Sequence, residues 1–356
     1  MTCWACPAKG IWMKIKEYSF ELPPELIAQT PIDKRGSDRL MVVDRTTGSV
    51  IDSEMSNFVD YLPSGCLLVV NNSKVRKARL YACSETGGTV EFLFLEENLD
   101  KSWQAMVTKA KRQHVGKHYT FGSDPFLFHA QVIAENDDGT RTVQFEEAIT
   151  EDFFQKLGHV PLPPYIKRDD DFQDEKRYQT IYAESEGSVA APTAGLHFTP
   201  EILAKVEAKG CTVVPITLHV GPGTFLPVRT EDLDDHPMHY ERFEISSESA
   251  HLINEAKRAA IPIVATGTTS VRTLESAFDE KTGRVLSGLN RTNLFIKPGY
   301  KWKVVDHLLT NFHTPESTLL VLVSTFAGKT LIDRAYQQAI DERYHFFSYG
   351  DAMLIL

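Results

Sequence analysis

Hydrophobic and polar residues alternate in three different ways along the chain. Near the N-terminus, residues 39–44 read R-L-M-V-V-D and predict a strand, which a Thr46-Thr47-Gly48 turn joins to a second strand at 49–52. Residues 65–71 form a continuous apolar run, G-C-L-L-V-V-N, which is typical of a strand buried on both faces. This first stretch therefore predicts a hairpin and a buried strand.

Between residues 75 and 157 the pattern changes to short alternating runs. Gly-Gly, Gly, Asp-Pro and Asp-Asp-Gly turns separate these runs, and no helical periodicity occurs before residue 148. Six short strands at this spacing indicate a small antiparallel β-barrel. The six predicted strands lie at 78–82, 89–95, 102–107, 118–121, 128–134 and 142–145.

From residue 158 onward, helical and strand-like segments alternate, which predicts an α/β sheet with loops facing a crevice. We therefore expect a discontinuous α/β domain, residues 13–74 and 158–356, with a small antiparallel β-barrel domain inserted at 75–157. Residues 1–12 precede the regular pattern and are interpreted as an N-terminal extension. Helices are expected at 200–209, 249–260, 268–278 and 331–343, strands at 212–220, 262–265 and 293–296, and either a strand or a buried helix at 318–326.

Composition is that of an ordinary globular protein of two domains, with 356 residues of which 42% are hydrophobic and 24% charged. No apolar run reaches the roughly 18 residues of a membrane helix. Cys66, Cys83 and Cys211 are scattered, as is usual for reduced cysteines of a cytosolic protein. Cys3 and Cys6 form a C-x-x-C without the second pair that a zinc site needs.

The net charge of −10 argues against a protein that coats nucleic acid, but the charge is unevenly distributed. Residues 71–81 include Lys74 and Arg76, and residues 101–118 include Lys109 and Arg112; neither run contains an acidic residue. Each run is either a solvated face or a contact for a polyanion.

Residues 187–240 hold four histidines among closely spaced glycines and prolines, which indicates backbone that turns tightly or approaches a ligand. We interpret this stretch as the floor of an active site. His219 ends a predicted strand before Gly221 and Gly223, where a histidine is either a satisfied structural group or a ligand or general base, and His197 follows Thr193 and Gly195. No metal is expected at His236 and His239, because Pro237 interrupts the pair and no further ligand is evident.

A second motif, I-V-A-T-G-T-T-S-V-R-T-L-E-S, predicts a strand, a tight turn at Gly267 and a helix. The free N–H groups at such a helix start favour an anion or a polar ligand head near Thr268 and Thr269. Arg272 and Glu275 share one helix face and either bind a ligand or pair with each other.

Two familiar motifs are incomplete in this sequence. Gly328-Lys329-Thr330 ends like a phosphate-binding loop, but Val323 stands where that motif needs glycine, so we expect a strand-to-helix turn. Ser, His and Asp residues are present at 311–317 and 348–351, yet no serine lies in a G-x-S-x-G elbow, which weakens a hydrolase interpretation.

Eight stretches together identify the chain as similar to a known family. In order they are P-L-P-P-Y-I, Y-Q-T-I-Y, V-A-A-P-T-A-G-L-H-F, L-H-V-G-P-G-T-F-L-P-V-R, D-D-H-P-M-H, G-T-T-S-V-R-T-L-E-S, K-V-V-D-H-L-L-T-N-F-H-T-P-E-S-T-L and F-F-S-Y-G-D-A-M. The chain resembles the S-adenosylmethionine:tRNA ribosyltransferase-isomerases of queuosine biosynthesis from Met13 to its C-terminus, more weakly in the barrel segment. Residues 1–12 have no counterpart.

The resemblance implies a cytosolic, commonly monomeric transferase that needs no metal and acts on tRNA, not at a membrane. S-adenosylmethionine, consumed as a substrate, would donate its ribosyl carbons to 7-aminomethyl-7-deazaguanine at the tRNA wobble position. Adenine and methionine leave, and the product is epoxyqueuosine.

Residue roles in this reaction are hypotheses. His219 and His197 are the first candidates for the base that removes a ribose C5′ proton, and His313 and His239 are secondary candidates. Arg272 suits the methionine carboxylate. The other candidates for substrate binding are Thr193, Gly195, Gly221, Gly223, Gly267, Thr268, Thr269, Glu275, Asn311, Ser317, Tyr349 and Asp351; Tyr349 or Phe198 could face the sulfonium. Lys74, Arg76, Lys109 and Arg112 are the candidates for tRNA phosphate contacts.

Two rival functions remain open on the sequence. A conventional methyltransferase should have a glycine-rich loop after its first strand, and residues 69–72 provide none. A non-catalytic RNA-binding module would not need the cluster of polar residues and glycines at 187–240.

Overall fold

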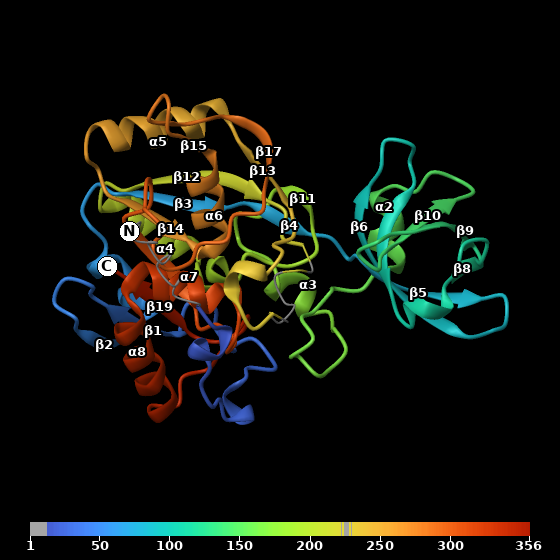
Figure 1. Cartoon of the computed structure of the whole chain (residues 1–356), viewed down its shortest axis with the longest axis horizontal. Helices are drawn as coiled ribbons and strands as arrows, with labels where there is room; N and C mark the ends of the chain where they lie inside the picture. Colours follow the sequence, from blue (N-terminus) through green and yellow to red (C-terminus); the bar gives the residue numbers. More distant parts are fainter. Residues whose placement is uncertain (1–12, 222, 224–227, 229) are drawn as a thin grey trace, which may run out of the picture.

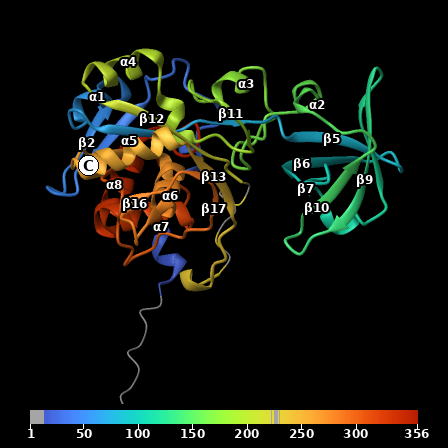
Figure 2. The ribbon, with the colours of Figure 1, turned by 90° about the horizontal axis from the view of Figure 1, so that it is seen from above.

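The computed structural model describes residues 13–221, 223, 228 and 230–356. These residues form an α/β domain and a separate β-barrel beside it, as Figures 1 and 2 show. The Cys3-x-x-Cys6 motif and the whole of residues 1–12 lie outside the described residues. Between the two domains lie the paired strands β4 (Ser73–Val75) and β11 (Ser185–Ser188).

A nine-stranded sheet forms the centre of the α/β domain, in the order β17-β13-β12-β3-β14-β18-β19-β1-β2. β12, β3, β14 and β18 are parallel neighbours, and β1 and β2 form the predicted antiparallel hairpin. The strands are β1 (Arg39–Val43), β2 (Val50–Glu54), β3 (Leu67–Asn71), β12 (Thr212–Leu218), β13 (Glu241–Ile245), β14 (Ile263–Thr266), β17 (Gly288–Thr292), β18 (His307–Asn311) and β19 (Ala352–Ile355).

Helices cover both faces of this sheet. Leu67 and Val69 of β3 belong to the hydrophobic cluster under α5, α6, α7 and α8, whereas Leu68 and Val70 belong to the cluster under α1 and α4. This alternation follows from the period of two in a strand, and it explains why the run is apolar throughout. The helices are α1 (Phe58–Tyr61), α3 (Asp174–Arg177), α4 (Pro200–Ala208), α5 (Ser247–Arg258), α6 (Gly267–Ala277), α7 (Thr318–Ala327) and α8 (Lys329–Asp341), with 3₁₀ turns at η1 (Ile15–Tyr18), η2 (Pro24–Leu26), η3 (Met55–Asn57), η5 (Thr193–His197) and η7 (Leu233–Asp235) and a small hairpin of β15 (Phe278–Asp279) and β16 (Arg284–Val285).

The inserted segment forms the closed antiparallel barrel that the alternating runs predicted. Its strand order is β10-β7-β6-β5-β8-β9, and α2 (Glu151–Leu157) packs Phe153 and Phe154 into the aromatic core. The fold class expected from the sequence is therefore confirmed. The barrel strands are β5 (Arg79–Ser84), β6 (Thr89–Glu97), β7 (Trp103–Val107), β8 (His118–Ser123), β9 (Phe126–Glu135) and β10 (Arg141–Phe145), with η4 (Ala110–Arg112) between β7 and β8.

Two local predictions need correction. The strand expected at 293–296 is absent, and the neighbouring strand is β17 (Gly288–Thr292), which pairs with β13. The ambiguous segment 318–326 is helix α7, which is apolar on most sides because it is buried. Gly328, with φ of +91°, therefore joins two helices and not a strand to a helix.

Among the described residues, no helix is long and apolar enough to cross a membrane.

Candidate active site

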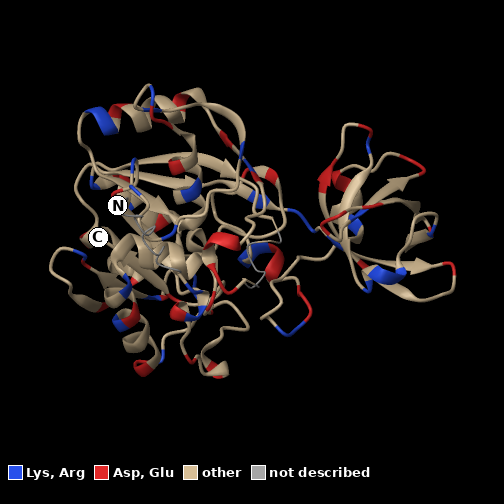
Figure 3. Ribbon diagram, in the orientation of Figure 1, with Lys and Arg blue, Asp and Glu red and all other residues tan. Residues whose placement is uncertain are grey.

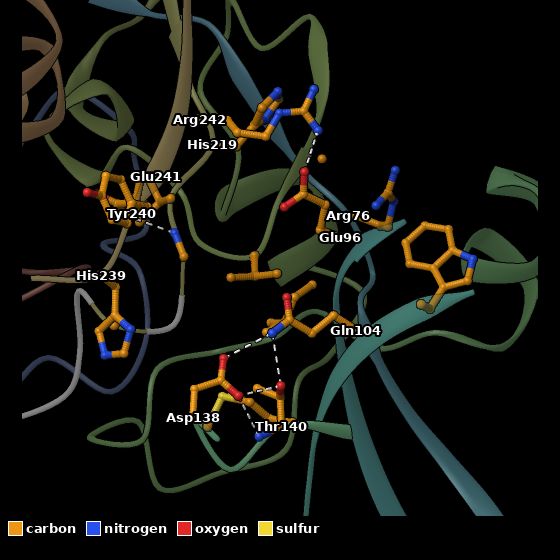
Figure 4. Close-up of a pocket in the computed structure, with 18 of the residues that line it drawn as sticks. Arg76, Glu96, Gln104, Asp138, Thr140, His219, His239, Tyr240, Glu241 and Arg242 are labelled. Atoms are coloured by element: carbon orange, nitrogen blue, oxygen red, sulfur yellow. Dashed lines mark hydrogen bonds and ion pairs between the residues drawn. The ribbon is translucent and has the colours of Figure 1, made fainter. Parts of the chain in front are cut away.

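A large cavity lies between the two domains, with a volume of about 990 Å³. One wall comes from the α/β domain, at the end of β12 and at Arg272 of α6, and the other comes from β6, β7 and the β9–β10 turn of the barrel (Figure 4). Ligand sites commonly have volumes of about 300–1,000 Å³. This cavity is therefore large enough for a small substrate and part of a second one.

His219 stands at the end of β12 on the α/β wall. Its backbone N–H donates to Arg242 O at 2.9 Å, and its ring lies so close to Gly187 that a Cβ there would be 3.3 Å from its Cε1 atom. Ring atom Nδ1 is buried and has no hydrogen-bond partner among the residues that the structure describes. Burial, and then the charges of Arg242 and Arg76, lower the pKa of His219 to about 4. A neutral imidazole with an unused nitrogen is suited to accept a proton.

Arg272 and Glu241 form a buried ion pair beside His219. Each is only 5% exposed, and Arg272 Nη1 contacts Glu241 Oε2 while Arg272 Nε donates to Leu294 O at 3.1 Å. Glu241 Oε1 accepts a hydrogen bond of 3.0 Å from the Gly221 amide. Arg272 Nη2 is buried and has no hydrogen-bond partner in the described part of the chain, and Arg272 lines the cavity. The guanidinium is thus oriented, with one nitrogen left for a ligand.

The barrel wall is polar and is linked to the other domain by ion pairs. Glu96 of β6 contacts Arg242 at 2.9 Å and Arg291 at 3.3 Å. Gln104 of β7 donates to Asp138 and Thr140 of the β9–β10 turn. These residues carry no signal in the sequence, because they occupy outward-facing positions of barrel strands that usually face solvent.

A second, smaller cavity of about 70 Å³ adjoins the first, since Val220 and Leu319 line both. It lies at the N-terminus of α6, where Thr266 provides no side-chain cap, so the first amides of the helix are available to a ligand. Six predicted site residues line it: Thr193, Gly267, Thr268, Thr269, Asn311 and His313.

His197 belongs to a buried polar chain. Asn311 Nδ2 lies 3.1 Å from His197 Nε2, and His197 Nδ1 lies 3.2 Å from Asp38 Oδ2. Burial raises the pKa of Asp38, but the charge and hydrogen bond of His197 outweigh this effect and hold the pKa below its ordinary value. His197 lines neither cavity, so it supports Asn311 from behind.

The other two histidine candidates differ in exposure. His313 is buried, 2.9 Å from Thr310 Oγ1, and burial lowers its pKa to about 3. His239 lines the large cavity and packs against Gly223, where a Cβ would lie 2.6 Å from its Cδ2 atom. Among the described residues, no group of three His, Cys, Asp or Glu side chains is arranged to hold a metal.

Several other predicted site residues line neither cavity, and their polar groups are engaged within the protein. Asp351 accepts from the amides of Arg39 and His345, and Tyr349 donates to Asp174 at 2.6 Å. Ser317 caps α7 by accepting from the Leu320 amide. Gly195 and Phe198 are buried, and a Cβ on Gly195 would lie 2.2 Å from the Tyr182 hydroxyl. Their placement favours structural roles over contact with substrate.

Glu275 is also engaged within the protein and does not pair with Arg272. Its carboxylate accepts from the amides of Lys303, Val304 and Val305 and from the Tyr300 hydroxyl.

Glu275→Leu should lower the free energy of unfolding by about 1–3 kcal/mol or more, because buried N–H groups lose their acceptor. Urea unfolding measures the change in free energy, and Glu280→Leu is the control because the carboxylate of Glu280 is exposed. Equal unfolding midpoints for the two variants would contradict the anchoring role of Glu275.

The basic runs differ in how far their charges are neutralised. Lys74 pairs with Glu186 at 2.7 Å and Arg76 pairs with Glu151, so the first run contacts acidic residues from elsewhere in the chain. Lys109 and Arg112, at η4, are exposed and form no ion pair with any described residue. Figure 3 shows basic and acidic residues interspersed over both domains. The second run is the stronger candidate for contact with a polyanion.

Comparison with known proteins identifies the family. The family model described as "Queuosine biosynthesis protein" matches residues 15–355. The chain belongs to this family. It is 50% identical to the S-adenosylmethionine:tRNA ribosyltransferase-isomerase of Treponema denticola over 97% of this chain and 100% of the relative, and 47% identical to that of Clostridioides difficile over 96% and 100%.

A solved structure agrees with this membership. The crystal structure of the S-adenosylmethionine tRNA ribosyltransferase from Thermotoga maritima matches with a TM-score of 0.54 and 34% identity, over 96% of this chain and 100% of that one. The resemblance found in the sequence is therefore confirmed, and with it the expectation of an enzyme of the transferase class.

Proposed function

We propose that the protein transfers and isomerises the ribosyl group of S-adenosylmethionine onto 7-aminomethyl-7-deazaguanine at the tRNA wobble position. The product is epoxyqueuosine, and adenine and methionine are released. The single observation that carries this proposal is His219, a neutral imidazole that lines a cavity of about 990 Å³ between two domains. Family membership supports the choice of substrates.

His219 acts as the first base. The positive sulfonium acidifies the adjacent C5′ hydrogens of the ribose, and the imidazole of His219, which lines the cavity, accepts one of these protons. Loss of adenine and opening of the ribose follow, the amine of the acceptor base attacks, and methionine leaves. Because the pKa of His219 is about 4, its imidazole is ready to accept a proton at neutral pH without prior deprotonation.

The α/β wall binds the sulfonium substrate. Arg272, which lines the cavity, donates to the methionine carboxylate, and Glu241 keeps the guanidinium in place. Thr268 and Thr269 at the start of α6 offer further donors in the adjoining small cavity. The reaction needs no metal in this scheme, because the sulfonium itself supplies the charge that acidifies the ribose.

We further propose that the enzyme acts in the cytoplasm as a monomer, as is common in the family.

The unpaired cations at η4 contact tRNA phosphates. Lys109→Ala/Arg112→Ala should weaken tRNA binding and reduce the slope of log K against log salt concentration by about 2, since each phosphate contact contributes roughly 0.9. Filter binding between about 50 and 200 mM salt measures the slope. Lys205→Ala/Lys281→Ala, which removes two exposed cations that do not line the cavity, is the matched control. An unchanged slope in the η4 variant would remove these two residues from the tRNA surface.

An assay of adenine release tests the proposed function. Purified enzyme with S-adenosylmethionine should release adenine only when tRNA carrying the aminomethyl base is added. A methyltransferase would instead release S-adenosylhomocysteine, and a non-catalytic RNA-binding module would release neither product. Either of those results would overturn the proposal.

A further inference from the structure

Gln104 stands on the barrel wall of the large cavity, on the side opposite His239 (Figure 4). It belongs to β7, in which Trp103 and Ala105 point into the barrel core and Gln104 and Met106 point outward. An outward position on a small barrel normally faces solvent. Here the outer face is turned toward the α/β domain, so the side chain reaches the cavity.

The hydrogen bonds of the β9–β10 turn determine which way the Gln104 amide faces. Thr140 Oγ1 donates to Asp138 Oδ1 at 2.6 Å and accepts from Asn136 Nδ2 at 2.9 Å. Because its only hydrogen is directed at Asp138, Thr140 Oγ1 can only accept from Gln104. Asp138, a carboxylate, can only accept as well. Both atoms near the Gln104 amide are therefore acceptors, and only its nitrogen can face them.

The nitrogen of Gln104 is fully used in this arrangement. Nε2 donates to Asp138 Oδ2 at 3.0 Å and to Thr140 Oγ1 at 2.9 Å, one contact for each of its two hydrogens. The carbonyl oxygen Oε1 has no partner among the described residues and points away from that pair in Figure 4. The chain thus holds a neutral hydrogen-bond acceptor in a set orientation, which lowers the entropy cost of binding a donor.

The nearby charges favour a donor-rich ligand. Asp138 makes no ion pair with any described residue, whereas Glu96 and Glu151 on the same wall are paired with arginines. An acceptor beside an unpaired carboxylate attracts an N–H group and repels a phosphate or a carboxylate. The anionic parts of both substrates consequently belong elsewhere, near Arg272 and η4.

We propose that Gln104 Oε1 is a specificity-determining contact that accepts a hydrogen bond from the primary amine of the acceptor nucleobase. This inference rests on the proposed function. A neutral carbonyl suits this task, because the amine must be neutral to attack and a direct contact with a carboxylate would favour its ammonium form. Both Asp138 oxygens already accept hydrogen bonds from Gln104 and Thr140, so the amine meets the amide oxygen. Thr140 and Asp138 are positioning residues that hold the Gln104 amide.

The test compares two tRNAs that differ at one group. One carries the aminomethyl base, and the other carries its nitrile analogue, 7-cyano-7-deazaguanine, which lacks the N–H donors. Binding is measured without S-adenosylmethionine, so that no reaction occurs. Wild-type protein should bind the amine-bearing tRNA more tightly by about 10-fold or more, as expected for a lost hydrogen bond in a desolvated site.

In Gln104→Leu the ratio of the two dissociation constants should fall to about 1. Gln131→Leu, on the barrel but outside the cavity, is the matched control and should keep the wild-type ratio. The inference would be overturned if Gln104→Leu kept the same ratio as wild-type protein. It would also be overturned if the ratio measured for wild-type protein were near 1. If wild-type protein instead shows no tRNA-dependent adenine release, the proposed function itself fails, so the two failures are distinguishable.

Discussion

Replacement of His219 by alanine is expected to lower kcat for adenine release by on the order of 10²- to 10⁴-fold, the contribution of a positioned general base. The dissociation constant for S-adenosylmethionine should change little, because Arg272 and the start of α6 supply the binding contacts. Single-turnover kinetics and calorimetric titration measure the two quantities separately. Full activity in His219→Ala, or loss of binding equal to the loss of rate, would contradict the role as base.

The pH dependence of the wild-type enzyme provides a second readout of the same residue. An ordinary histidine is protonated below about pH 6.5. Burial and the neighbouring arginines lower the pKa of His219 to about 4, so its basic form persists down to about that pH. The loss of activity that its protonation causes should therefore begin near pH 5 and not near pH 7. A fall in kcat centred at pH 6.5 would point to a different base.

Removal of Arg272 is expected to have the largest effect on stability. Arg272→Met should lower the free energy of unfolding by about 3–5 kcal/mol, because it removes the buried cation that compensates the charge of the Glu241 carboxylate. Arg272→Lys keeps a charge but not the fork that contacts both Glu241 and Leu294 O, and should also weaken S-adenosylmethionine binding.

The double variant Arg272→Met/Glu241→Gln is the control for this prediction. It removes the uncompensated charge, so it should recover part of the stability lost in Arg272→Met. Urea unfolding of the two single variants and the double variant yields the coupling energy. Strictly additive losses would show that the two side chains do not depend on each other.

The fold was largely predictable because its signals are local. The continuous apolar run of β3, the alternating runs of the barrel and the Thr199-Pro200 start of α4 each follow from the environment of a single element. Segment 318–326 was ambiguous, since a fully buried helix and a buried strand are both apolar throughout. The strand expected at 293–296 was wrong because pairing with β13 selects residues 288–292, and register is a tertiary property.

The site was predictable only on one side. Glycines and histidines mark the α/β wall, and the structure brings His219, Arg272, Gly221, Gly223 and His239 to one cavity. Buried carboxylates such as Glu275 and Asp351 look alike in sequence whether they hold backbone amides or bind a substrate. Gln104, Asp138 and Glu96 gave no signal, because the packing of one domain against the other turns a solvent-facing pattern into a cavity wall.

Isotope-labelled S-adenosylmethionine distinguishes transfer of the ribosyl group from transfer of the methyl group. S-adenosylmethionine labelled with ¹³C at the ribose carbons is incubated with the enzyme and with tRNA carrying the aminomethyl base, and the modified nucleoside is analysed by mass spectrometry. All five labelled ribose carbons are expected in the nucleoside, and His219→Ala should yield almost no labelled product. An unlabelled nucleoside, or one that has gained only a methyl group, would contradict transfer of the ribosyl group.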